Sequence, residues 1–133
     1  MDYGGKPYVE NIEKMGLTNT NFRTAIWTGS HMQMTLMCIP PCGDIGLEVH
    51  ANTDQFIRVE QGKALVKMGP CQKQLNFSQM MYKGDAVFIP AGAWHNVMNV
   101  ETRPLKVSVI YAPSHHPKGT VHRTKQDAQI EEW

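Results

Sequence analysis

The stretch from Gly84 to Asn99 constrains the fold of this chain more than any other segment. It reads GDAVFIPAGAWHNVMN and sets two glycines, a proline, a histidine and an asparagine at fixed intervals. The apolar runs on either side of Pro90-Ala91-Gly92 predict a strand, a sharp turn that needs glycine, and a second strand. His95 then lies in the second strand, close to the turn.

Short apolar segments separated by glycine and proline continue along the chain at nearly regular intervals. This pattern is typical of an all-β sandwich or barrel. Strands are predicted at Met32–Ile39, Ile45–His50, Gln55–Gln61, Lys63–Met68, Gln72–Phe77, Asp85–Ile89, Trp94–Val100 and Leu105–Tyr111.

The two ends of the chain are less regular than its centre. Residues Tyr8–Thr24 suggest one or two amphipathic helical turns followed by a loop, which we interpret as an arm packed on the barrel. Ser114–Gly119 has the composition of a loop, and Thr124–Glu131 is compatible with a short exposed helix.

Composition excludes several classes of protein. The chain has 133 residues, enough for one domain with its own core, and its 13 basic and 12 acidic residues are scattered, so a nucleic-acid partner is not expected. No apolar run approaches the roughly 20 residues that span a bilayer, and the N-terminus lacks a signal-like core, so we expect a cytoplasmic protein without a membrane partner. Three cysteines without a Cys-x-x-Cys pair predict neither a disulfide framework nor a thiolate zinc site.

Four polar residues in or beside the predicted strands form a candidate metal site. Glu48 and His50 are two residues apart on an extended segment, so they share one face, and Gln55 opens the next strand. His95 would join them from a distant strand if the sheet closes. Burying such groups together costs several kcal/mol unless a cation binds them. The alternative is that Glu48 and His50 form an exposed edge pair and that His95 is a core histidine bonded to backbone.

The spacing of these residues resembles that of the cupin family. The pattern Gly84-x5-Pro90-x-Gly92-x2-His95-x3-Asn99 matches the second cupin motif at every defining position. The first motif matches in spacing, but glutamate and glutamine replace its first histidine and its glutamate; its positions are Glu48, His50, Gln55 and Gly62.

The chain is thus similar to small single-domain cupins, in particular to bacterial ones labelled mannose-6-phosphate isomerase-like. The resemblance implies a double-stranded β-helix, or jelly-roll cupin barrel, forming one domain over residues 1–133. Its core would span about 32–111, with an N-terminal arm at 1–31 and a C-terminal loop and short helix at 112–133. It also implies a homodimer, because a small barrel with open sheet edges would otherwise leave them exposed.

The resemblance implies that Glu48, His50, Gln55 and His95 hold a divalent zinc, manganese, iron or nickel ion. We expect an enzyme that uses this ion as a Lewis acid on a small oxygenated substrate such as a sugar or carboxylate, in an isomerase, epimerase or lyase reaction. A metal-dependent dioxygenase and a non-enzymatic small-ligand binder are the alternatives.

Strand alternation indicates which side chains would line the barrel. With Gln55 inward, Ile57 and Val59 also face inward, and in the last strand we favour the set with Val107, Val109 and Tyr111 inside. Tyr111 then lies at the rim, as a candidate catalytic acid or substrate anchor. His115, His116 and His122 fall in a loop, where they are either exposed rim histidines or part of a lid, Ser114–His122, over the barrel mouth.

Overall fold

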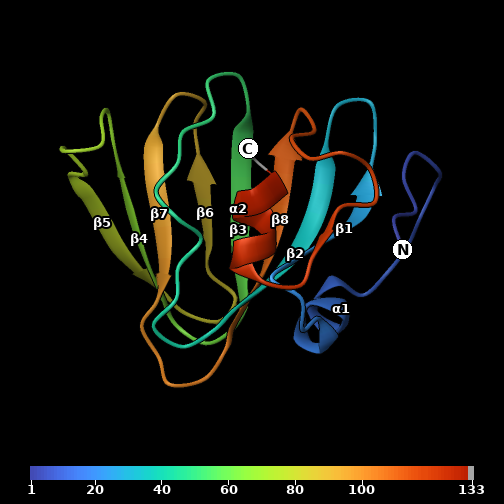
Figure 1. The fold of residues 1–133 in the computed structure, drawn as a ribbon, viewed down its shortest axis with the longest axis horizontal. Coiled ribbons are helices and arrows are strands. Elements are labelled where there is room, and N and C mark those ends of the chain that lie inside the picture. Colours follow the sequence, from blue (N-terminus) through green and yellow to red (C-terminus); the bar gives the residue numbers. More distant parts are fainter. Residues whose placement is uncertain (132–133) are drawn as a thin grey trace.

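The computed structural model describes residues 1–131 and contains two facing antiparallel sheets (Figure 1). The larger sheet has the strand order β6-β3-β8-β2-β1-β9, and the smaller has the order β5-β4-β7. The strands are β1 (Arg23–Thr28), β2 (Gln33–Ile39), β3 (Asp54–Gln61), β4 (Ala64–Gly69), β5 (Phe77–Met81), β6 (Ala86–Ile89), β7 (Trp94–Asn99), β8 (Leu105–Ala112) and β9 (Val121–His122). The all-β jelly-roll prediction is confirmed.

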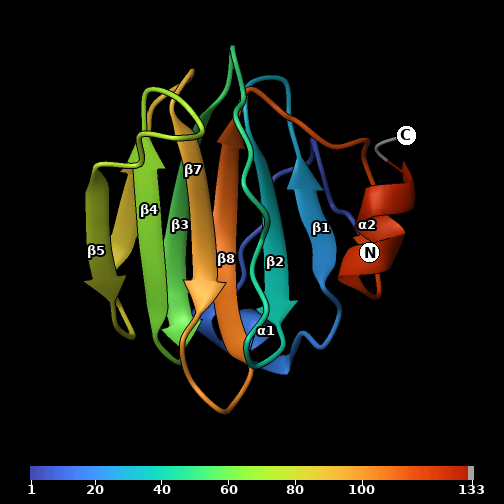
Figure 2. The same ribbon diagram turned by 60° about the vertical axis from the view of Figure 1, so that its left-hand side comes forward.

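Two short helices accompany the sheets. Helix α1 (Ile12–Thr18) begins where the Asn11 side chain accepts a hydrogen bond from the Lys14 amide at 2.9 Å. It packs against the outer face of the larger sheet, where Lys106 donates to the Leu17 carbonyl at 2.6 Å. Helix α2 (Lys125–Glu131) lies beyond β1 at the far side of the molecule (Figure 2). The short C-terminal helix predicted from the sequence is therefore present.

The core lies between the sheets and is built from alternate residues of their strands. Ile57, Val59, Val107 and Val109 are all at most 1% exposed and face the interior, as alternation predicted. The opposite face of β3 carries Arg58 and Glu60, and Glu60 is buried there because α1 covers it.

Two predicted strands are wrong, and two strands, β1 and β9, were missed. Segment 45–50 is extended and runs beside β7, but it joins the sheet only through the isolated bridges Asp44↔Met98 and Glu48↔His95. The predicted strand Gln72–Phe77 is instead a turn and loop that leads into β5. The N-terminal arm predicted at 1–31 contains strand β1. This strand pairs with β2 and β9 inside the larger sheet.

The motif residues that are not candidate ligands shape the turns. Gly92 has a φ of +86° and its amide donates to the His50 carbonyl at 2.8 Å, which ties the turn to the first motif. The Asn99 side chain donates to the carbonyls of Ile39 and Arg103 at 3.0 and 2.9 Å and so fixes the turn after β7. None of the helices within residues 1–131 is long and apolar enough to cross a membrane.

Candidate metal centre

Three of the four predicted ligands meet at one end of the barrel. Possible ligand atoms of Glu48, His50 and His95 all lie within 4.8 Å of one another. Glu48 Oε1 is 3.2 Å from His50 Nε2 and 3.3 Å from His95 Nε2. The alternative of an exposed edge pair is therefore wrong, since the Glu48 carboxylate points inward between two imidazoles.

Backbone pairing explains why Glu48 and His95, which are 47 positions apart, meet. Glu48 and His95 exchange two backbone hydrogen bonds of 3.0 and 2.9 Å, so the first motif lies directly against the start of β7. Paired residues of antiparallel strands project their side chains to the same face. The turn at Gly92 supplies the sharp reversal that brings β7 back to this position.

The tautomer of His95 decides what its other nitrogen can do. Nδ1 lies 3.0 Å from the Ala93 carbonyl oxygen, which can only accept, so Nδ1 carries the proton. In the neutral ring, Nε2 then presents a lone pair toward the Glu48 carboxylate. His95 is 1% exposed and Nε2 has no hydrogen-bond partner. Two acceptors that face each other in a buried site are satisfied when a cation, either a proton or a metal ion, lies between them.

His50 and Gln55 present similar unsatisfied atoms. His50 Nε2 is buried without a hydrogen-bond partner, as are both side-chain atoms of the Gln55 amide. Gln55 is 4% exposed and opens β3, opposite Tyr111 of β8. Buried polar groups in proteins are nearly always hydrogen-bonded, so these orphaned atoms fit the donor set of a divalent metal site.

The charges at the site keep Glu48 ionised. Burial acts to raise the pKa of its carboxyl, but the neighbouring imidazoles of His50 and His95 outweigh burial and hold that pKa well below its usual range. An ionised carboxylate and two imidazole nitrogens are the protein ligands found in many zinc and non-haem iron sites.

The sequence placed Tyr111 at the rim of the barrel, but in the structure this residue is buried. It is 1% exposed, because the rings of His115 and His116 lie 5.6 and 5.1 Å from its own. Burial raises the pKa of its phenol, so the hydroxyl stays protonated at neutral pH. His116 Nε2 lies 3.4 Å from that hydroxyl.

The loop of residues 113–119 covers this end of the barrel. The His115 ring lies 4.2 Å from the His50 ring. Burial and the charge of Arg23 lower the pKa of His116 to about 3, and burial likewise lowers that of His115. Both imidazoles are therefore neutral at physiological pH. Of the two possibilities left open by the sequence, the lid matches the positions of His115 and His116.

A buried glutamine holds this loop in place. The Gln33 side chain is fully buried, and its Oε1 accepts from the amides of His115 and His116 at 3.2 and 2.9 Å. Its Nε2 donates to the His116 carbonyl at 2.8 Å. In the sheet, Gln33 pairs with Tyr111, which pairs with Gln55, so these three residues form a polar row across the mouth of the barrel.

Two residues of this region were missed in the sequence. Gln33 and Arg23 are buried polar side chains at 0% and 3% exposure. The signal for Arg23 was a charged residue inside the apolar segment from Phe22 to Trp27. Because no strand was predicted for that segment, the burial of Arg23 was not expected.

Known proteins of similar sequence and structure agree with this architecture. The chain is 54% identical to the uncharacterized protein YrkC of Bacillus subtilis over 127 residues, which cover 96% of this chain and 68% of that protein. It is 37% identical to an uncharacterized protein of Acanthamoeba polyphaga mimivirus over 115 residues, covering 86% of this chain and 70% of that protein.

The crystal structure of BH2720 from Bacillus halodurans matches with a TM-score of 0.96 and 52% identity over 97% of this chain and 98% of that one. A cupin sugar phosphate isomerase from Silicibacter pomeroyi matches at a TM-score of 0.55 and 22% identity, over 64% of this chain and 52% of that one, and supports the fold alone. The family profile described as "Cupin domain" matches residues 35–111. The chain therefore belongs to the cupin family.

Proposed function

We propose that this protein is a metal-dependent enzyme in which Glu48, His50, His95 and Gln55 bind one divalent ion. The observation that supports this most directly is the buried Nε2 of His95, which faces the Glu48 carboxylate with no hydrogen-bond partner. A bound divalent ion would supply Lewis acidity to a carbonyl or hydroxyl oxygen of a small substrate.

The surrounding residues would assist in defined ways. Tyr111 keeps its proton at neutral pH and so is suited to donate a hydrogen bond or a proton to a substrate oxygen. His115 and His116 lie over His50 and Tyr111 and would exclude water from the reacting groups. These roles fit an isomerase, epimerase or lyase acting on a sugar or a carboxylate.

A dioxygenase is the second candidate, favoured by one observation. Two histidines and one carboxylate meet at the centre, and this is the ligand set of many non-haem iron oxygenases. Oxygen consumption by the iron-loaded or nickel-loaded protein, and not by the zinc-loaded protein, would distinguish this activity from Lewis-acid catalysis. A non-enzymatic small-ligand binder is the third candidate, favoured if metal and ligand bind but no member of a substrate panel is converted.

Elemental analysis of untreated protein, followed by metal titration, tests the proposal. The wild type should contain about one divalent ion per chain. His95→Ala should lose nearly all of it and Gln55→Ala only part, because a neutral amide oxygen is the weaker ligand. His31→Ala, at an exposed histidine outside the site, is the matched control and should retain the wild-type content. Absence of metal from the wild type, or equal retention in all three variants, would contradict the assignment.

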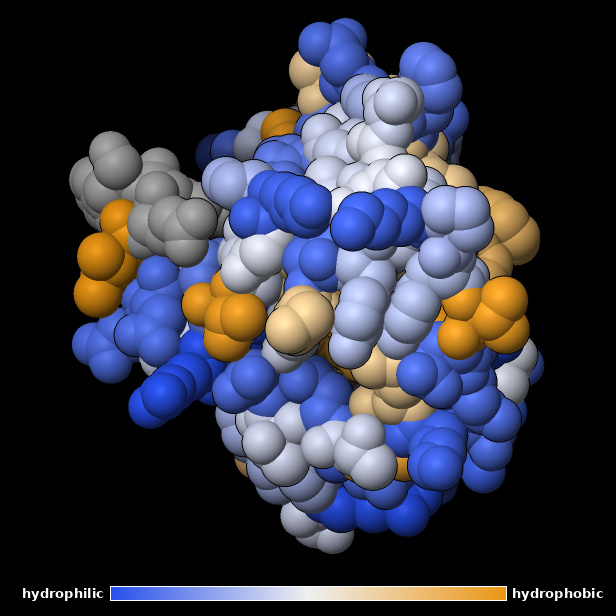
Figure 3. All heavy atoms as spheres, turned by 90° about the vertical axis from the view of Figure 1, so that its right-hand side faces the viewer, coloured by the Kyte–Doolittle hydropathy of each residue, from blue (hydrophilic) through white to orange (hydrophobic). Residues whose placement is uncertain are grey.

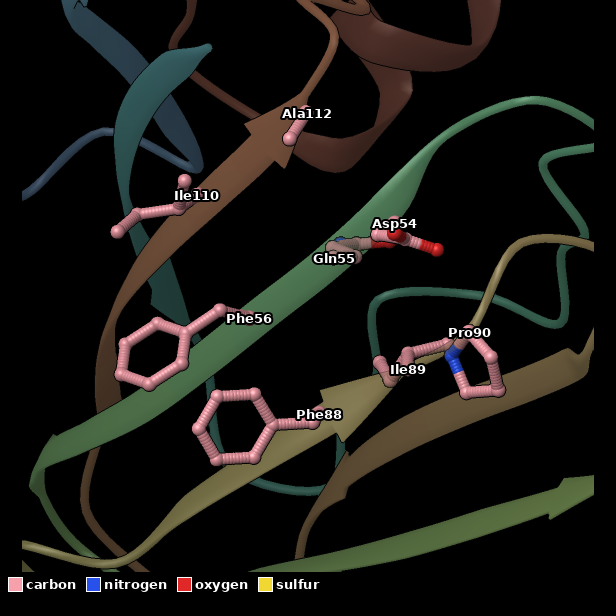
Figure 4. A pocket seen from close by; sticks show the side chains of 8 residues that line it. All are labelled: Asp54, Gln55, Phe56, Phe88, Ile89, Pro90, Ile110 and Ala112. Atoms are coloured by element: carbon pink, nitrogen blue, oxygen red, sulfur yellow. The ribbon is translucent and has the colours of Figure 1, made fainter.

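We also propose that the protein is a homodimer. Phe56 and Phe88 contact each other edge to face, with ring centroids 5.1 Å apart, beside the edge strand β6. They line a groove of about 330 Å³ on the outer face of the larger sheet, together with Ile110 (Figure 4). On the side of the molecule drawn in Figure 3, hydrophobic side chains are instead scattered among polar ones. The groove beside β6 is thus the surface best suited to a second copy.

A further inference from the structure

Arg23 is a buried cation that forms no ion pair with a carboxylate of residues 1–131. Its side chain lies inside the barrel from β1 and is 3% exposed. Nη1 lies 3.1 Å from His122 Nδ1 and Nη2 lies 4.0 Å from the Met37 sulfur, while Nε has no hydrogen-bond partner. Within residues 1–131, no carboxylate lies close enough to form an ion pair with it.

Burial of a guanidinium without an anion is unfavourable. An isolated buried charge loses its hydration, and the His122 imidazole, the Tyr111 hydroxyl and the Met37 thioether replace only part of it. Two other arginines of this chain form ion pairs: Arg58 Nε lies 2.7 Å from the Glu60 carboxylate, and Arg103 Nε lies 3.6 Å from that of Glu101. Arg23 therefore differs from them in lacking the partner that its burial requires.

A chain of side-chain contacts connects Arg23 to the candidate metal centre. His122, which contacts Arg23, lies with its ring 6.1 Å from that of His116. His116 lies 3.4 Å from the Tyr111 hydroxyl, and the Tyr111 ring is 6.3 Å from that of His50. Both Arg23 and Glu48 act electrostatically on Tyr111. The cation and the metal centre thus belong to one interior.

The charges of the described residues in this interior point to an anionic ligand. Arg23 and Glu48 carry opposite charges, and both act on Tyr111 between them. Binding of a divalent ion at Glu48 would leave two net positive charges in a region with little access to water. A ligand with two negative groups neutralises them, one at the metal and one at the guanidinium, whose planar fork suits carboxylate and phosphate oxygens.

We propose that Arg23 is the anion-binding subsite of the barrel and that the natural ligand is a small organic acid with two anionic groups. One group would bind the metal held by Glu48, His50 and His95, and the second would bind Arg23. This inference rests on the function proposed above and narrows its substrate class. The second group is either a carboxylate or a phosphate, which share the oxygen chemistry that a guanidinium recognises.

Calorimetric titration of the zinc-loaded protein tests the inference. The probes are malonate, which has two carboxylates, 2-phosphoglycolate, which has a carboxylate and a phosphate, and acetate, which has one negative group. We expect malonate or 2-phosphoglycolate to bind at least tenfold more tightly than acetate, and the tighter of the two identifies the second group. If neither malonate nor 2-phosphoglycolate binds more tightly than acetate, the inference is wrong.

Two variants locate the binding. Arg23→Met should weaken binding of the tighter-binding probe, malonate or 2-phosphoglycolate, roughly 10- to 100-fold, as expected for loss of a charge-assisted hydrogen bond. Arg103→Met removes an exposed arginine and should change it less than twofold. Equal binding by wild type and Arg23→Met would overturn the inference. Zinc affinity is measured first, because it separates the two proposals. A wild type that does not bind zinc contradicts the metal centre. A wild type that binds zinc, but binds the two-anion probes no better than Arg23→Met does, contradicts only the Arg23 subsite.

A crystal structure keeps the inference testable if Arg23→Met does not fold. Wild-type zinc-loaded protein crystallised with malonate should show one carboxylate within hydrogen-bond distance of the Arg23 guanidinium. Malonate bound with neither carboxylate at Arg23, or absent from the barrel, would overturn it.

Discussion

At the scale of single residues, the candidate metal centre is defined by polar atoms that the protein leaves without partners. His95 is fixed by its Nδ1 contact with the Ala93 carbonyl, so its other nitrogen is directed inward. Gln55 has no such anchor, and both of its amide atoms are buried and unpaired. In the metal-free protein, unpaired buried atoms of this kind lower the folding stability.

Gln55→Met should therefore separate stability from metal binding. Methionine has a similar volume and removes two unpaired buried atoms, so the metal-free variant should be more stable by about 1 kcal/mol. Its zinc affinity should fall because a ligand oxygen is lost. Urea unfolding without metal and zinc titration measure the two effects. A variant that is both less stable and unchanged in zinc affinity would show that Gln55 is a packing residue.

His116 gives the protein a specific sensitivity to acid. Arg23, His115, His122, Glu48 and Tyr111 surround it, and its pKa of about 3 compares with 6.5 for an ordinary histidine. Between these values the unfolded chain takes up a proton that the folded protein does not, so folding stability decreases as the pH falls from about 6.5 toward 3.

His116→Gln should reduce that sensitivity. Glutamine does not titrate, so the wild type should lose about 1 to 2 kcal/mol more stability than the variant between pH 7 and pH 5. Urea unfolding of both metal-free proteins at several pH values measures the difference. Parallel stability curves for the two proteins would mean that His116 is not protected from protonation.

At the scale of structural elements, the loop of residues 113–119 is held chiefly by the Gln33 side chain of β2, with further hydrogen bonds from Ser114 and Gly119. Gln33 forms hydrogen bonds with both backbone amides and one carbonyl of the His115-His116 pair. The loop has few other attachments to the large sheet near the mouth; the Ser114 hydroxyl, which donates weakly to the carbonyls of Gly29 and Met32 at 3.2 Å, is one of them. Access to the barrel interior thus depends on the Gln33 contacts.

Gln33→Met should release this loop while leaving the sheet intact. We expect a loss of about 1 to 3 kcal/mol in folding stability, since buried partners lose their hydrogen bonds. Hydrogen exchange of the His115 and His116 amides should become markedly faster than in the wild type. Gln79→Met, at an exposed glutamine of β5, is the control and should leave both quantities unchanged. Unchanged exchange in Gln33→Met would show that other contacts hold the loop.

At the scale of the whole molecule, the outer face of the larger sheet is divided into two regions. Helix α1 covers Glu60 on one part of this face, whereas Phe88, on the edge strand β6, remains 74% exposed. An exposed aromatic pair beside an edge strand is a surface that proteins usually cover.

Phe88→Glu should convert the proposed dimer into a monomer. A charge in the centre of an apolar contact is left unpaired and desolvated, which opposes association. Phe77→Glu, at the 48% exposed phenylalanine of β5, is the matched control and should remain dimeric. Light scattering coupled to gel filtration measures the mass of each. A monomeric wild type, or a dimeric Phe88→Glu, would contradict the proposed interface.

The amino-acid sequence predicted the all-β class and the positions of most strands, because alternation and glycine or proline turns are local signals. It also indicated that Glu48, His50 and His95 would meet, since the spacing of Gly92 and His95 reflects a turn whose geometry is local as well. The strand predictions failed at 45–50 and 72–77. Segment 45–50 is extended and lies beside the sheet with only isolated bridges, and segment 72–77 is a turn and loop.

The burial of further polar residues becomes visible only when the strands are assembled. Arg23 and Gln33 come from two different strands, and no local pattern distinguishes them from exposed residues of the same type, whereas alternation already placed Tyr111 inside. Their burial depends on β9 closing one end of the larger sheet and on the loop of residues 113–119 covering the mouth. Those contacts join segments about 80 to 100 positions apart, and sequence periodicity carries no information at that distance.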